Sequence, residues 1–164
     1  MKKYLGLFLG IIMVFVIGCG STPAPKQQDT APKITDISAQ KKQLQGTTID
    51  GFGYKSSKLD QSKYDNWAKE NYPLVMEILN KLPDYNIQVT GHADASGPEE
   101  PVGDKPGNIK ISTDRAKPVY DALINAGVPE DRLSYKGIGS DDLLPDYDPK
   151  AAEQRRVTLV PIAR

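Results

Sequence analysis

The sequence predicts a two-layer α/β sandwich over residues 46–164, in which helices pack on one face of a mixed β-sheet. Segments that alternate apolar and polar residues, as half-buried strands do, interleave with segments of helical periodicity in the order βαβαββ. Segments rich in glycine and proline separate these elements. At 164 residues, the chain has room for this one domain and an N-terminal extension.

The N-terminal 45 residues differ in composition from the expected domain. Two lysines and an apolar run from Leu5 to Ile17 predict a secretory signal peptide over residues 1–18, because the run is shorter than the about 20 residues of a membrane-spanning helix. The run ends at Cys19 in a pattern that resembles the lipobox of bacterial lipoproteins, so we expect Cys19 to be acylated. An anchor helix with an incidental cysteine is the alternative.

Residues 19–45 are predicted to be the lipidated cysteine followed by a flexible linker. They are rich in Ser, Thr, Pro, Gln and Lys and show neither strand nor helix periodicity. Lys33–Leu44 could form a short helix, although nothing in the sequence requires one.

Charge and cysteine content exclude several classes of function. The formal net charge is zero, and residues 19–164 carry 19 basic against 21 acidic residues, which gives no concentrated basic face for nucleic acid. One cysteine cannot form an internal disulfide or a cysteine-rich metal site. The only histidine, His92, lacks the further ligands that a metal site would need. We therefore expect no metal, no cofactor and no nucleic-acid partner.

The first half of the expected domain contains a strand and a helical region. Thr48–Tyr54 is predicted to form the first strand, although its two glycines disfavour it. A helical face follows, but Pro73 interrupts it, and proline inside a helix costs about 3 kcal/mol. We therefore expect two helical pieces that meet near Tyr72-Pro73. Their shared apolar face consists of Trp67, Leu74, Val75, Ile78, Leu79 and Leu82.

The central segment is a strand, a loop and the start of a helix. The strand through Ile87 and Val89 ends at Gly91. After a loop rich in glycine and proline, the next helix is expected to begin with Ser112 as its N-cap and Arg115 in its first turn.

The last elements follow from the same periodicities. Apolar residues continue the helix to a stop signal at Gly127, and Pro118 predicts a distortion or a loose start. Leu133–Gly137 and Arg156–Val160 are the two remaining strands, with Pro161 marking an end or a sheet edge.

Three motifs in order carry a family resemblance. They are Gly91-His92-Ala93-Asp94, the pattern N-x-x-I-S-x-x-R-A from Asn108 to Ala116, and Gln154-Arg155-Arg156-Val157. Together they resemble the OmpA-like peptidoglycan-binding domain, a family that includes the peptidoglycan-associated lipoprotein, over about Thr47–Ile162. Phe52–Leu59 resembles the family's opening strand and turn, with Lys55 in place of the usual acid or amide.

The resemblance implies a site for the diamino acid of the peptidoglycan stem peptide. Asp94 would bind its ammonium, and Arg115 would bind its carboxylate through two parallel hydrogen bonds. Backbone groups of the turn Tyr54-Lys55-Ser56 would line the pocket. Asn108 would organise the loop and Ile111 would form the floor, unless both are purely structural. The expected supporting residues are His92, Ser112, Arg155 and Arg156.

The loop between the two charged contacts is longer than the usual form of this family. Residues 97–107 could form a lid or widen the site. The acids Glu99, Glu100 and Asp104 could compete for Arg115 or recognise a second ammonium.

These observations predict an outer-membrane lipoprotein that binds peptidoglycan stem peptides from the periplasmic side and is not an enzyme. Gly20, where an Asp commonly retains lipoproteins in the inner membrane, favours the outer membrane. The alternative is an envelope lipoprotein whose domain docks a protein partner instead of the wall. A cell-wall hydrolase ranks last, because the sequence offers no credible nucleophile, metal cluster or paired acids. The sequence does not choose between diaminopimelate and a substitute such as ornithine.

Overall fold

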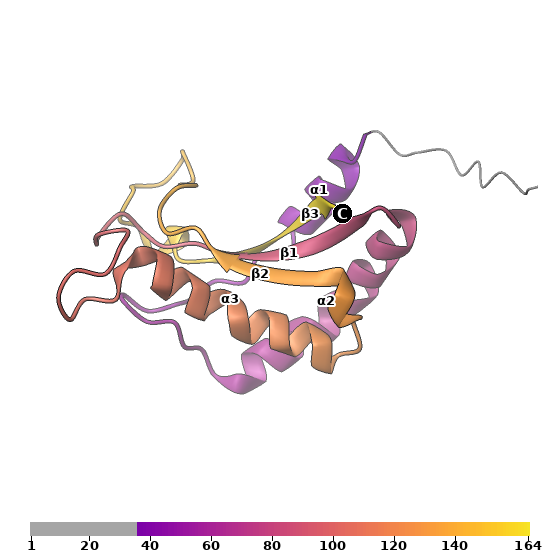
Figure 1. Cartoon of the computed structure of the whole chain (residues 1–164), viewed down its shortest axis with the longest axis horizontal. Helices are drawn as coiled ribbons and strands as arrows, with labels where there is room; N and C mark the ends of the chain where they lie inside the picture. The colour runs from indigo at the N-terminus through magenta and orange to yellow at the C-terminus, as the bar shows by residue number, and fades with distance from the viewer. Residues whose placement is uncertain (1–35) are drawn as a thin grey trace, which may run out of the picture. The chain divides into compact units, whose positions relative to one another are not determined.

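The computed structural model describes residues 36–164 and places a three-stranded sheet against two long helices (Figure 1). The predicted signal peptide, Cys19 and the first part of the predicted linker lie outside the described residues. The elements are α1 (Ser38–Gln45), α2 (Gln61–Lys81), β1 (Tyr85–Gly91), α3 (Gly107–Asn125), β2 (Leu133–Gly137) and β3 (Val157–Ala163), with 3-10 turns η1 (Glu130–Arg132) and η2 (Ala152–Gln154). No helix within residues 36–164 has the length and apolar character needed to cross a membrane.

The sheet has the strand order β2-β1-β3. The central strand β1 is parallel to β2, with Ile87 opposite Leu133, and antiparallel to β3, with Ile87 opposite Pro161. This mixed sheet with its helices confirms the predicted fold class. β3 continues past Pro161 to Ala163 because it is an edge strand, which needs ladder hydrogen bonds on one side only.

The predicted first strand is wrong. Thr48–Tyr54 contributes only an isolated antiparallel bridge, in which the Ile49 N–H donates to the Val157 carbonyl at 3.0 Å and the Val157 N–H donates back at 2.8 Å. Gly51 follows with a φ of +88°, which turns the chain out of the extended conformation. The order of the described helices and strands is therefore ααβαββ.

The two long helices are both continuous. Pro73 lies inside α2, so the prediction of two helical pieces is wrong, and Pro118 lies inside α3. Val75 and Ile78, just beyond the proline of α2, are fully buried in the core. Burying such side chains stabilises by about 1.5–3 kcal/mol each, which offsets the helical cost of the proline.

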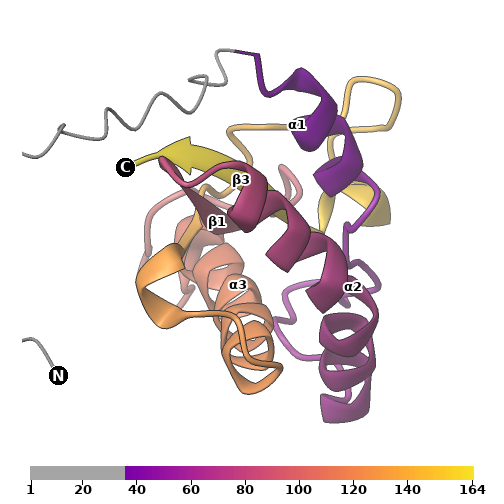
Figure 2. The ribbon, with the colours of Figure 1, turned by 90° about the vertical axis from the view of Figure 1, so that its right-hand side faces the viewer.

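α1 shows that the end of the predicted linker is folded. It packs against β3, and Leu44 at its end is fully buried in the core. The Trp67 indole donates to the Thr47 carbonyl at 2.8 Å and ties the segment after α1 to α2. Figures 1 and 2 show α1 on the opposite side of the sheet from α3. Two long helices thus cover one face as predicted, and the folded region begins before residue 46.

Two glycines bring the ends of β1 and β2 against one turn of α3. A Cβ at Gly91 would collide with the Ser112 carbonyl, and a Cβ at Gly137 would collide with the Thr113 N–H. Only glycine permits this close approach. The segment that follows β1 is therefore held beside the first turns of α3.

Candidate functional site

A small pocket lies where the segment after β1 meets the start of α3. Its volume is about 100 Å³, well below the roughly 300–1,000 Å³ of drug-sized ligand sites, so it suits one end group of a larger ligand. The residues that line it are Tyr54, Lys55, Ala93, Asp94, Ser96, Gly97, Pro98, Lys105, Pro106, Gly107, Asn108, Ile111 and Arg115.

The structure brings six of the predicted ligand-binding residues to this pocket. They are Asp94, Arg115, Tyr54, Lys55, Asn108 and Ile111. Ser56 and the four predicted supporting residues do not line it. Ser96 and Lys105 also line the pocket and were not among the residues predicted from the motifs.

Arg115 is the buried cation of the pocket and is only 1% exposed. Its Nε donates to the Ser56 carbonyl and its Nη1 to the His92 carbonyl, both at 2.8 Å, while Nη2 donates to the Gly53 carbonyl at 3.4 Å. A guanidinium has five N–H donors, so two remain for a ligand. Burial, assisted by the nearby charge of Arg155, lowers the pKa of Arg115 to about 10, and the group stays cationic at neutral pH.

The environment expected for Arg115 needs a correction. α3 begins at Gly107, so Ser112 is inside the helix and is not its N-cap, and Arg115 is not in the first turn. The first N–H groups of α3 are already used, since those of Asn108 and Ile109 donate to loop carbonyls at 2.8 and 3.1 Å. The helix terminus therefore does not supply free donors beside Arg115.

Asp94 is held in place by two hydrogen bonds, and its side chain is 6% exposed. Oδ2 accepts from Nη1 of Arg155 at 2.9 Å, and Oδ1 accepts from the Ser96 N–H at 3.0 Å. Burial by itself would raise the pKa of Asp94, but the bonds from Ser96 and Arg155 outweigh it, and the net pKa is lowered. The carboxylate is therefore ionised, with Arg155 already paired to it.

The turn Gly53–Ser56 forms one wall of the pocket. The Ser56 N–H was predicted to be available to a ligand, but it donates to the Gly53 carbonyl at 3.0 Å. The N–H groups of Tyr54 and Lys55 have no hydrogen-bond acceptor within residues 36–164. Lys55 has a φ of +54°, the only positive φ among the non-glycine residues described. Such backbone strain concentrates at functional sites.

The long loop is fastened to α3 through Asn108 and Glu99. The Asn108 side-chain amide donates to the Gly97 carbonyl and to the Glu99 carboxylate, both at 3.1 Å. Glu99 also accepts from the hydroxyl and the N–H of Ser140. Glu99, Glu100 and Asp104 form no ion pair with Arg115 in the described structure, so the predicted competition is absent there.

The remaining predicted residues act from outside the pocket. Arg156 donates to the Asp142 carboxylate at 3.1 Å. The two neighbouring arginines therefore have different partners, since Arg155 pairs with Asp94 and Arg156 pairs with Asp142. Nε2 of His92 lies 2.9 Å from the Thr158 hydroxyl, and burial lowers the pKa of His92 to about 4, which keeps it neutral. The Ser112 hydroxyl accepts from the Gly139 N–H at 3.0 Å. Between residues 36 and 164, no cluster of His, Cys, Asp or Glu is arranged to hold a metal ion.

The fold and the pocket define a class of protein. It is an α/β domain with a mixed sheet and, beside the segment that follows the central strand, a small pocket lined by an acid and an arginine. The model of the OmpA family matches residues 51–156, and the chain belongs to that family. The resemblance predicted from the three motifs is confirmed.

Individual relatives agree with this membership. The chain is 36% identical over 100 residues to Outer membrane protein A of Serratia odorifera, a match that covers 58% of this chain and 39% of that protein. The chain thus spans well under half of that relative's length.

Solved structures share the fold at 20–22% identity. The OmpA-like domain of FopA1 from Francisella tularensis gives a TM-score of 0.53 over 71% of each chain. The periplasmic domain of Helicobacter pylori MotB gives 0.52 over 71% of this chain and 74% of its own. The peptidoglycan-associated lipoprotein from Burkholderia pseudomallei gives 0.51 over 79% of this chain and 99% of its own.

Proposed function

We propose that this chain is a non-catalytic lipoprotein of the outer membrane that binds the diamino acid of the peptidoglycan stem peptide and so tethers the membrane to the cell wall. The observation that carries the proposal is that Asp94 and Arg115 line the same small pocket. Membership of the OmpA family and the likeness to a peptidoglycan-associated lipoprotein support it. The lipobox-like segment at Cys19 supports lipid anchoring, with the domain facing the periplasm.

In this mechanism the ligand is a zwitterion gripped at both charges. Its carboxylate accepts hydrogen bonds from the two Arg115 N–H groups that do not bond backbone carbonyls. Its ammonium donates to Asp94, whose carboxylate Arg155 and Ser96 keep ionised and oriented. Tyr54 and Lys55 line the pocket, and their N–H groups, which have no acceptor within residues 36–164, would add donors for a carboxylate. Because both charged groups are already fixed, little ordering is needed on binding.

The test is co-sedimentation of the purified protein with isolated cell-wall sacculi. Asp94→Asn removes the charge but keeps the shape, and we expect about 10- to 100-fold weaker binding, as for a lost charged hydrogen bond of about 1.5–3 kcal/mol. Asp121→Asn is the matched control, because Asp121 forms only an exposed pair with Lys117 on α3. Circular dichroism checks that both variants are folded.

Equal sedimentation of Asp94→Asn and the unaltered protein would refute the proposed site. Failure of the unaltered protein to sediment, together with recovery of an envelope protein from detergent extracts, would favour the alternative of protein docking. Release of soluble fragments from labelled peptidoglycan would overturn the non-catalytic assignment.

A further inference from the structure

The charges around the pocket do not balance for a simple zwitterion. Its lining contains three cations, Lys55, Lys105 and Arg115, and one acid, Asp94. A ligand with one ammonium and one carboxylate would use Asp94 and Arg115. It would leave the two lysines without anionic partners.

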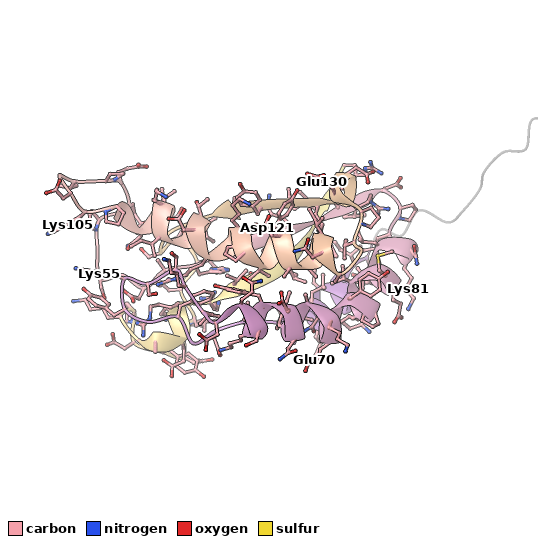
Figure 3. All side chains as sticks on the ribbon, turned by 90° about the horizontal axis from the view of Figure 1, so that it is seen from below. Lys55, Glu70, Lys81, Lys105, Asp121 and Glu130 are labelled. Atoms are coloured by element: carbon pink, nitrogen blue, oxygen red, sulfur yellow. The ribbon has the colours of Figure 1, made fainter. Side chains whose placement is uncertain are left out.

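The two lysines reach the pocket from separate segments. Figure 3 shows Lys55 and Lys105 at the same end of the molecule, Lys55 on the turn after Phe52 and Lys105 on the long loop. Lys105 is fixed by a tight hairpin, in which the backbones of Val102 and Lys105 exchange two hydrogen bonds of 3.1 Å around Gly103 with a φ of +58°. The backbone of each lysine is therefore held in a fixed turn, and neither lysine lies in a chain terminus.

Neither lysine has a carboxylate partner among residues 36–164. In the part of the chain that the structure describes, neither ammonium forms an ion pair, and that of Lys55 lies 5.1 Å from the centre of the Tyr54 ring. Asp104, the acid next to Lys105, does not line the pocket, and Glu99 is occupied by Ser140 and Asn108. Lys55 also occupies the one strained non-glycine backbone position described, where glycine would be the unstrained choice.

We propose that Lys55 and Lys105 form a cationic rim that binds a second carboxylate of the ligand, so that the site selects stem peptides with free carboxylates over amidated ones. This inference rests on the proposed function of the pocket. A stem peptide offers such a group in the α-carboxylate of the acidic residue that precedes its diamino acid. Amidation of that carboxylate removes the charge and leaves the diamino acid unchanged.

The experiment is calorimetric titration of the purified full chain with two synthetic tripeptides. One is L-alanyl-γ-D-glutamyl-meso-diaminopimelate with the carboxyl at the L-centre of the diaminopimelate capped as an amide, and the other is the same capped peptide amidated also at the glutamate α-carboxyl. The variants are Lys55→Gln, Lys105→Gln and the double variant. Lys58→Gln is the matched control, since Lys58 is exposed near the same turn but outside the pocket. Asp94→Asn reports on the proposed function independently.

We expect the unaltered protein and Lys58→Gln to bind the acidic peptide about 5- to 10-fold more tightly than the amidated one. Each single variant should lose about two- to fivefold of this preference, as for exposed ion pairs, and the double variant should lose all of it. The preference should also shrink with added salt, because the lysines are exposed.

Two results would refute the proposal that the rim binds a second carboxylate. One is equal binding of the two peptides by the unaltered protein, and the other is a preference that survives in the double variant. If the two peptides bind equally to the unaltered protein and Asp94→Asn weakens both, only the rim has failed. If neither peptide binds to the unaltered protein, the proposed function has failed and the rim fails with it.

Discussion

Arg115 is expected to hold the domain together as well as to bind a ligand. Its guanidinium bonds the carbonyls of Gly53 and Ser56 in one segment and of His92 in another, which are 62, 59 and 23 residues away in the chain. It also lies 5.3 Å from the centre of the Phe52 ring. We therefore predict that Arg115→Ala loses stability and does not behave as a simple binding-site variant.

The magnitude follows from what the truncation leaves behind. Three carbonyls lose their donor, and each unsatisfied buried group costs about 1–3 kcal/mol, less where pocket water can replace the donor. A total of about 3–5 kcal/mol is a large share of the 5–15 kcal/mol typical of a folded domain. At about 3–4 °C per kcal/mol for this size, the Tm should fall by roughly 10–20 °C. Arg115→Lys keeps the charge but only part of the bonding, so we expect about half of this loss.

Thermal unfolding followed by circular dichroism measures the effect. Arg164→Ala is the control, because that side chain is 47% exposed and makes only a 3.7 Å ion pair, and its Tm should change by no more than about 2 °C. A Tm of Arg115→Ala within that same range would refute the structural role. Loss of wall binding by Arg115→Ala is informative only after this measurement.

Two further predictions concern pH and the buried charges. Arg155→Met should destabilise the protein by about 3–5 kcal/mol at pH 7, because it leaves the Asp94 carboxylate buried without its partner. The folded pKa of Asp94 is lowered, so its contribution is complete above the unfolded pKa and is lost as pH falls through the folded pKa. The penalty of Arg155→Met should therefore shrink in acid, and a penalty that denaturant titrations find unchanged at low pH would contradict this origin. His92 has a folded pKa of about 4, below its ordinary 6.5, so the unfolded state takes up the proton first and stability should fall by about 3 kcal/mol between pH 6.5 and 4. His92→Asn should flatten that part of the stability curve, and an unchanged slope would show that other groups cause it.

The elements predicted best are those whose buried face repeats along the chain. Ile87 and Val89 alternate in β1 as predicted, and the apolar residues that continue α3 include Val119 and Leu123 at helical spacing. All four are buried. The start of α3 was missed because its first N–H groups are satisfied by carbonyls of the long loop, which no local signal encodes. The interruption expected at Pro73 failed for a related reason, since packing of the whole helix outweighs one lost hydrogen bond.

The candidate site also has features that the sequence predicts and features that only the structure shows. By itself, the sequence determined which side chains are candidates for the site, because the motifs around Asp94 and Arg115 are short and local. Only the tertiary structure decided that Arg155, 61 residues from Asp94, is its partner, while the adjacent Arg156 turns to Asp142. Only the tertiary structure brought Lys105 to the pocket. The physical reason is that periodicity records which face of an element is buried, whereas the choice of partner depends on how distant segments meet in space.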